Sequence, residues 1–222
     1  MDKLLAFLFM AIDHAGVILF PSNALLRLIG RFAMPIYAYG IAKGYYFSVK
    51  HNTLTKYKRN LFVLALVSQI PFMVMVGDAK LNICYTWLLA IYLMEYILNK
   101  KHIKLYILIF VYSFLQVFLP VDYGMLGLLL PIGFYCFEKD FFEQEKRTLS
   151  LMIYPYVIFL TLFYALIDVG DLRTIQYYCV LFVPILNFAL SKKFDKVIIP
   201  KWINYCFYPL SMIPFLMIKY LM

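Results

Sequence analysis

The side chains best suited to do chemistry are two ionisable residues that stand next to each other in the first apolar stretch of the chain. They are Asp13 and His14. An ionisable group inside hydrocarbon is costly unless it is paired or faces a cavity, so such groups usually mark functional sites. Histidine is also the side chain whose ordinary pKa suits proton transfer near neutral pH. His14 is therefore either a general base or a structural histidine that is hydrogen-bonded within the fold.

A helical conformation would separate these two side chains. Adjacent residues on a helix point about 100° apart, so Asp13 need not be the carboxylate that orients His14. Arg31, close to the start of the second apolar stretch, is an alternative partner for Asp13. Such an ion pair could belong to a site or be purely structural, and the residues alone do not separate the two readings.

Further polar residues open later apolar stretches. Asn82 and Thr86 lie one helical turn apart at the start of the fourth stretch, and Asp122 and Tyr123 open the sixth. If successive stretches cross a membrane, these residues meet Asp13, His14 and Arg31 at one level near the outer side. The alternatives are that Thr86 joins two helices, as small polar residues often do, and that Asp122 marks a surface turn.

A basic run precedes the third apolar stretch. It reads Thr55, Lys56, Tyr57, Lys58 and Arg59. Cations with an aromatic ring among them suit the phosphates and ring of an anionic cofactor. A run of cations beside an apolar stretch can also be a membrane anchor, and without other information that reading is preferred.

The composition decides which elements must position these residues. Of the 222 residues, 64% are hydrophobic and only 15% charged, and the mean hydropathy is +0.80. A soluble domain cannot hide so much apolar surface, and the long apolar runs lack the alternation of barrel strands. The four cysteines show no CxxC spacing, so neither a metal site nor a disulfide framework is expected. The composition predicts an all-α, polytopic transmembrane helix bundle.

Windows of about 17 to 20 apolar residues divide the chain into about nine spans. We expect the first span to be retained, because it carries charged residues and no cleavage pattern follows it. The connection around Pro120 is short enough that the two spans beside it could instead merge into a tightly bent hairpin or a re-entrant segment. No linker or repeat interrupts residues 1–222, which we expect to form a single membrane domain. The predicted spans are 3–20, 30–49, 60–77, 82–98, 103–119, 121–137, 149–168, 174–190 and 204–222.

The lysines and arginines predict the orientation of these spans. Cytoplasmic loops carry a positive excess, and here every even-numbered connection is basic while the odd-numbered ones hold few cations. The N-terminus is therefore expected in the cytoplasm and the C-terminus outside. Contact with anionic membrane lipids accounts for the net charge of +9, so no nucleic-acid partner is expected. The basic residues of the even connections are Lys50, Lys56, Lys58, Arg59, Lys100, Lys101, Lys104, Lys139, Lys146, Arg147, Lys192, Lys193, Lys196 and Lys201.

Six short strings, in order along most of the chain, resemble the signature of TraX-type membrane proteins. Each string is weak alone, and their shared order makes the resemblance specific. That family is named for a protein that N-acetylates conjugative pilin, and it is similar to a wider set of membrane acyltransferases. The strings are Asp13-His14, Gly30 to Pro35, Tyr57 to Leu61, Ser68 to Phe72, Leu81 to Thr86, and Asp122 to Gly127.

The resemblance implies an acetyltransferase in the bacterial cytoplasmic membrane. It would move an acetyl group from cytoplasmic acetyl-CoA, without a metal, to an amine or hydroxyl on the outer side, such as a protein N-terminus or a surface glycan. His14 would be the base, Asp13 and Arg31 would fix the site, and Asn82 would donate to the oxyanion. The remaining expected residues are Lys56, Tyr57, Lys58 and Arg59 for CoA, and Thr86, Asp122, Tyr123 and Tyr208 for the acceptor.

One position departs from the family pattern. After Tyr208, Pro209 and Leu210 the family has a histidine, whereas this chain has Ser211. The change puts the acceptor, the rate or the activity itself in question. Two other functions stay open: a small proton-coupled secondary transporter with Asp13 and His14 as a proton relay, and a membrane scaffold without catalysis.

Overall fold

The computed structural model describes residues 2–143, 150–167, 182–183, 186 and 200–221. Within these residues the fold is all-α, as the composition predicts, and the only β feature is an isolated bridge between Leu81 and Val121. The described helices are α1 (Asp2–Ile18), α2 (Ala24–Gly30), α3 (Ala33–Lys50), α4 (Leu54–Val76), α5 (Ile83–Leu98), α6 (His102–Phe118), α7 (Gly124–Glu143), α8 (Ile153–Ile167) and α10 (Lys201–Leu221).

Each predicted span coincides with one of these helices, except 174–190, which lies almost wholly outside the described residues. Two boundaries differ from the prediction by more than the others. Helix α4 begins at Leu54, so the basic run belongs to its first turns instead of a loop, and α7 continues to Glu143. The short helix α2 was not predicted, and it begins where the side chain of Asn23 accepts hydrogen bonds from two backbone N–H groups of its first turn.

Helix α4 has 23 residues and, among the described helices, is the one both long and apolar enough to cross a membrane by length and composition. Three shorter apolar segments lie at Ile83–Leu98, His102–Phe114 and Tyr205–Leu221. Multiple membrane crossings therefore stay a prediction.

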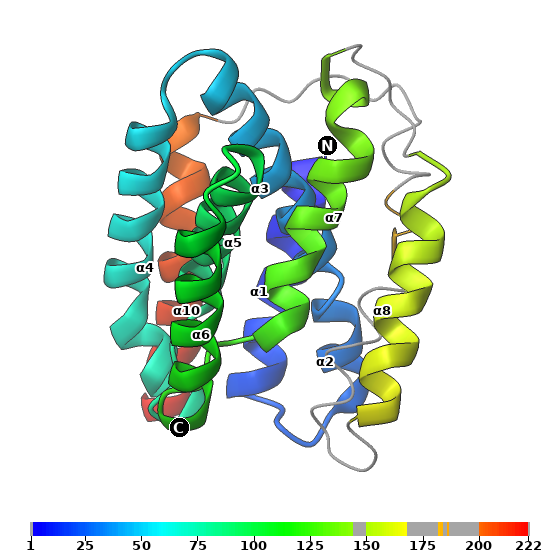
Figure 1. Ribbon diagram of the computed structural model, residues 1–222. Coiled ribbons are helices and arrows are strands. Elements are labelled where there is room, and N and C mark those ends of the chain that lie inside the picture. Colours follow the sequence, from blue (N-terminus) through cyan, green and yellow to red (C-terminus); the bar gives the residue numbers. More distant parts are fainter. Residues whose placement is uncertain (1, 144–149, 168–181, 184–185, 187–199, 222) are drawn as a thin grey trace.

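The long helices stand side by side (Figure 1). Helix α3 packs against α7, α1 against α2 and α10, α5 against α7, and α4 against α10 and α5. The α3–α4 and α5–α6 connections lie at the same end of the bundle as the N-terminus, whereas the α4–α5 and α6–α7 connections lie at the other end with the C-terminus. The basic run of α4 is thus at the N-terminal end of the bundle, and Asp122 is at the opposite end.

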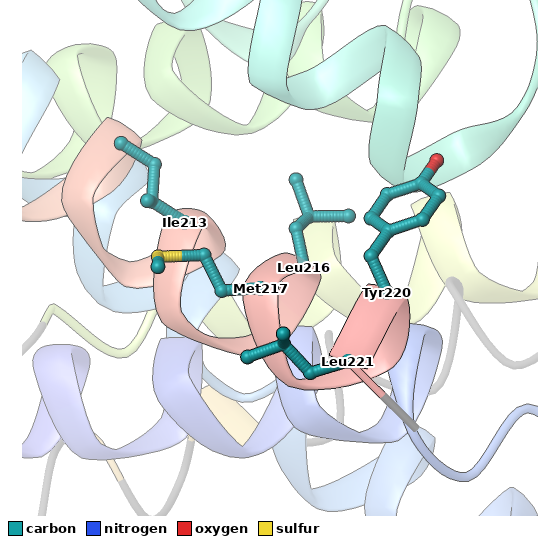
Figure 2. Close-up of a pocket in the computed structure, with 5 residues that line it drawn as sticks. All are labelled: Ile213, Leu216, Met217, Tyr220 and Leu221. Carbon is teal, nitrogen blue, oxygen red and sulfur yellow. The ribbon is translucent and has the colours of Figure 1, made fainter.

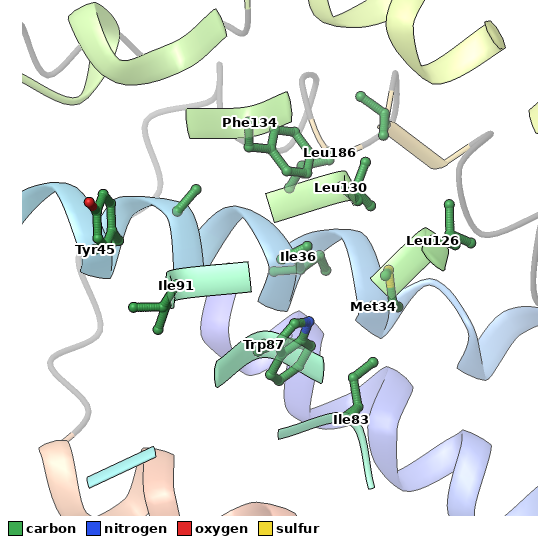
Figure 3. Packing of buried hydrophobic residues seen from close by; sticks show 14 of the residues in the cluster. Met34, Ile36, Tyr45, Ile83, Trp87, Ile91, Leu126, Leu130, Phe134 and Leu186 are labelled. Carbon is green, nitrogen blue, oxygen red and sulfur yellow. The ribbon is translucent and has the colours of Figure 1, made fainter. Parts of the chain in front are cut away.

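The core lies where α3, α5 and α7 meet (Figure 3). Ala38 and Ala42 of α3 and Ala90 of α5 are completely buried, and their small side chains let the helices approach closely. Large side chains such as Ile91 and Phe134 fill the space between these contacts. This packing fixes the positions of the polar residues that α3, α5 and α7 carry.

The connection before α7 is a turn between two separate helices. Leu81 donates its backbone N–H to the Pro120 carbonyl over 3.0 Å and accepts from the Asp122 N–H over 2.8 Å. Tyr123, which follows, has a positive φ of 58°. These contacts tie the turn to the start of α5, and they bring Asp122 and Tyr123 towards the polar residues of α1 and α2.

Candidate functional site

His14 is a residue of α1 and is buried against α10, with 3% of its surface exposed. Its Nδ1 atom is 2.9 Å from the Ser211 hydroxyl of α10. The same hydroxyl donates to the Tyr208 carbonyl oxygen over 2.9 Å. The Tyr208 ring is tilted against the imidazole with 5.9 Å between the ring centres. Ser211, the position where the family pattern has histidine, is therefore a direct contact of His14.

Asp13 faces Arg31, as the helical geometry suggested. Arg31 Nε is 3.5 Å from Asp13 Oδ1, although these two buried atoms form no hydrogen bond. The guanidinium also donates from Nη1 to the Tyr123 hydroxyl over 2.7 Å. Burial lowers the pKa of the nearby Arg27, and the positive charge of Arg31 lowers it further. Asp13 thus pairs with Arg31, which the sequence offered as an alternative partner, and Tyr123 contacts the same guanidinium.

Gly30 makes this ion pair possible, because α2 crosses α1 with its backbone directly against Asp13. A Cβ atom on Gly30 would collide with the Cα and Cβ atoms of Asp13 and would lie 2.6 Å from its backbone nitrogen. Arg31 follows immediately and caps α2. The close approach thus delivers the guanidinium to the carboxylate.

Gly30→Ala is expected to lower the free energy of unfolding by about 1–3 kcal/mol, because the backbone of α1 cannot yield as a flexible side chain would. Gly40→Ala is the matched control, since a Cβ there meets nothing within 4 Å. Thermal unfolding of both variants in detergent tests the expectation. Equal midpoints for the two variants would contradict it.

Asn82 joins α4 to α5 and has no free amide hydrogen. Its Nδ2 donates to the Ala65 carbonyl over 2.8 Å and to Gln69 Oε1 over 3.0 Å, and its Oδ1 accepts from the Cys84 N–H over 3.0 Å. Donation to an oxyanion, the role expected for Asn82, would require one of the Nδ2 bonds to break. In the described structure Asn82 is a helix cap and a bridge between two helices.

The side chain of Thr86 contacts the backbone of Asp122. The Thr86 hydroxyl donates to the Asp122 carbonyl over 2.9 Å, which joins α5 to the start of α7. The Asp122 carboxylate pairs with Lys80 over 3.2 Å. Both residues are buried, so the turn that holds them is fixed at the edge of the polar group around Arg31.

Some residues of the basic run of α4 have contacts within the protein, and others are exposed. Lys58 pairs with Glu95 over 2.7 Å and lies 4.4 Å from the Tyr92 ring centre. The Tyr57 ring packs towards α3, where its hydroxyl approaches Gly44. The exposed cations of the run are Lys56 and Arg59, so these two are the ones available to an anionic ligand.

Besides Arg31 Nε, the core contains two neighbouring buried donors that have no hydrogen-bond partner in the part of the chain that the structure describes. They are the Tyr37 hydroxyl of α3 and the Trp87 indole Nε1 of α5. The sequence analysis did not select them, because a tyrosine and a tryptophan within apolar stretches look like ordinary core residues. That these donors lack a hydrogen-bond partner within the described residues is evident only from the folded structure.

The surface hollow on α10 offers no comparable chemistry. Figure 2 shows its lining, which consists of side chains from the last turns of that helix. A hollow of this kind can hold an apolar chain but cannot bind charge or transfer a proton. The lining residues are Ile213, Leu216, Met217, Tyr220 and Leu221.

Comparison with known proteins gives one family and one distant relative. The sequence model of the TraX protein family matches residues 2–219. An uncharacterized protein of Rickettsia prowazekii (strain Madrid E) is 28% identical over 183 residues, which are 76% of this chain and 67% of the relative. No solved structure matches.

Proposed function

The chain belongs to the TraX family, and from this premise we propose that it is a membrane-embedded acyltransferase. It would take an acetyl group from cytoplasmic acetyl-CoA and pass it to an amine or hydroxyl on the outer side of a bacterial cytoplasmic membrane. The observation that carries the proposal is the buried group of His14, Ser211, Asp13 and Arg31, which lies inside the bundle instead of on its surface.

The proposal includes about nine membrane crossings with the N-terminus in the cytoplasm. Two features support it. The basic connections α3–α4 and α5–α6 lie at one end of the bundle, as the orientation rule requires of a cytoplasmic end. Helix α6 packs mainly on α5 and exposes large apolar side chains that lipid would cover, among them Ile103, Phe110 and Phe118.

The reaction would need His14 to move one proton. The lone pair of the acceptor attacks the thioester carbonyl carbon, and the imidazole takes the N–H or O–H proton of the acceptor. The tetrahedral intermediate then collapses, the carbon–sulfur bond breaks, and the imidazolium returns the proton to the departing sulfur. The products are the acetylated acceptor and free CoA.

The two ends of the bundle suit the two substrates. Lys56 and Arg59 are exposed at the N-terminal end and would bind the phosphates of CoA, because cations there form charge-assisted hydrogen bonds. Asp122 and Tyr123 lie near the opposite end, where an outer acceptor would enter. Donor and acceptor would meet at His14 from opposite sides, so neither needs to cross the whole bundle.

Arg59→Ala is expected to weaken acetyl-CoA binding about tenfold or more, since a hydrogen bond between charged groups is worth roughly 1.5–3 kcal/mol. Lys101→Ala, which removes the same charge from the α5–α6 connection, is expected to leave the affinity nearly unchanged. Calorimetry on the detergent-purified protein measures both. Absence of binding to folded wild-type protein would exclude acetyl-CoA as the donor and favour the proton-coupled transporter.

A further inference from the structure

Tyr37 and Trp87 present two buried donors in the same part of the core. Their rings are 5.9 Å apart with an angle of 34° between the planes, one from α3 and one from α5. Neither the Tyr37 hydroxyl nor the Trp87 Nε1 has a hydrogen-bond partner within the described residues. Buried donors in folded proteins are nearly always satisfied, so two neighbouring exceptions indicate a partner from outside the chain.

Shared packing contacts connect Tyr37 with the surroundings of His14. Tyr37 packs against the small cluster of Phe7, Met10 and Ala33, which Tyr208 also contacts. Met10 is one helical turn before His14 on the same face of α1. Packing through this cluster and Tyr208 therefore links the pair to the imidazole.

Trp87 enters this region from α5. It follows Thr86, whose hydroxyl is bonded to the turn before α7. Figure 3 shows its indole beside α3, among Met34, Ile36 and Ile83, and 7% of the residue is exposed. Its indole N–H is thus held in an apolar environment, where a hydrogen bond to a ligand is strengthened by the low dielectric.

We propose that the Tyr37 hydroxyl and the Trp87 indole N–H bind the carbonyl oxygen of an acyl thioester and present its carbonyl carbon to the base. This inference rests on the proposed function and assigns the carbonyl-binding role to residues other than Asn82, whose amide hydrogens are already donated. When the acceptor attacks, the carbonyl oxygen gains negative charge, so the same two donors bind it more tightly in the transition state.

Acetyl-CoA and S-ethyl-CoA separate this role from general CoA binding, because the thioether has the same size and phosphates but lacks the carbonyl oxygen. Wild-type protein is expected to bind acetyl-CoA more tightly than S-ethyl-CoA, by about threefold to tenfold for each of the two donors that bonds the carbonyl oxygen. Tyr37→Phe and Trp87→Phe are each expected to reduce this preference without changing the affinity for S-ethyl-CoA. Tyr45→Phe, a buried tyrosine about two turns further along α3, is the matched control and keeps the preference.

Two further readouts exclude a purely structural role. Tyr37→Phe removes a hydroxyl that has no partner, so the melting temperature of the ligand-free protein is expected to stay the same or rise. The infrared carbonyl stretch of bound acetyl-CoA labelled with carbon-13 at the carbonyl is expected at a lower frequency in wild-type protein than in either variant, because hydrogen bonds weaken the carbonyl bond.

The outcomes distinguish failure of this inference from failure of the proposed function. If wild-type protein binds neither ligand, acetyl-CoA is not the donor and the proposed function fails together with the inference. If wild-type protein binds both ligands equally, or if Tyr37→Phe and Trp87→Phe keep the preference, the carbonyl is bound elsewhere and only the inference fails. Loss of both affinities together with a lower melting temperature would assign the pair to packing and also overturn the inference.

Discussion

His14→Gln is expected to slow acetyl transfer by about 10²- to 10⁴-fold, the usual contribution of a positioned general base. Glutamine fills a similar volume and its amide can donate to the Ser211 hydroxyl, so the contact between α1 and α10 is kept. It cannot take a proton from the acceptor. Acetyl-CoA affinity and the melting temperature are therefore expected to stay close to those of the wild-type protein.

The hydrogen bonds around Ser211 specify which nitrogen acts as the base. A hydroxyl has one hydrogen, and Ser211 gives it to the Tyr208 carbonyl. Its oxygen then accepts from His14, which places the imidazole proton on Nδ1 and leaves the lone pair on Nε2. The proposed proton transfer thus uses Nε2.

Release of free CoA thiol in the presence of a panel of amines and sugar hydroxyls measures the effect of His14→Gln. The matched control is His51→Gln, since His51 is exposed at the end of α3, and its rate is expected to equal that of wild-type protein. A His14→Gln variant that keeps more than about a tenth of the wild-type rate would show that another group accepts the proton.

Arg31→Met is expected to lower the free energy of unfolding by about 3–5 kcal/mol, the usual cost of leaving a buried charge without its partner. Asp13, whose side chain is largely buried, would then lose the cation that lies 3.5 Å from its Oδ1. Combining Arg31→Met with Asp13→Leu is expected to recover much of this loss, because neither charge then remains buried. The lost bond to Tyr123 would not be recovered.

A double-mutant cycle in denaturant measures the coupling between the two side chains. Arg27→Met, on the same short helix, is the control for a lost arginine and is expected to cost less than about 1 kcal/mol, because burial and the positive charge of Arg31 already disfavour the charge of Arg27. Strictly additive effects of Asp13→Leu and Arg31→Met would contradict an energetic link between the two side chains.

The long helices could be located from the sequence because the apolar runs that mark them are continuous along the chain. Apolar windows located them within a few residues, and helical geometry separated Asp13 from His14 and selected Arg31 as a partner. Helix α2 was missed because its seven residues are too few for a window of about 17. The start of α4 was placed too late because its first turns are basic, although charge does not prevent helix formation.

The contacts of the candidate site were harder to predict because they depend on which helices meet. The contact of His14 with Ser211 joins residues 197 positions apart. Asn82 was selected for its chemistry, but its hydrogen bonds to α4 become evident only when α4 and α5 pack together. Tyr37 and Trp87 stand out because their donors have no hydrogen-bond partner within the described residues, which no sequence pattern records.

The pairing of His14 with Ser211 also has a consequence for the order in which the site forms. Among the described helices, α1 leaves the ribosome first and α10 last. Until α10 docks, the imidazole has no hydroxyl to hold its ring, and Nε2 has no fixed direction. A bundle that still lacks α10 would therefore contain its histidine but not an oriented base, so the proposed acetyl transfer would begin only after α10 has docked on α1.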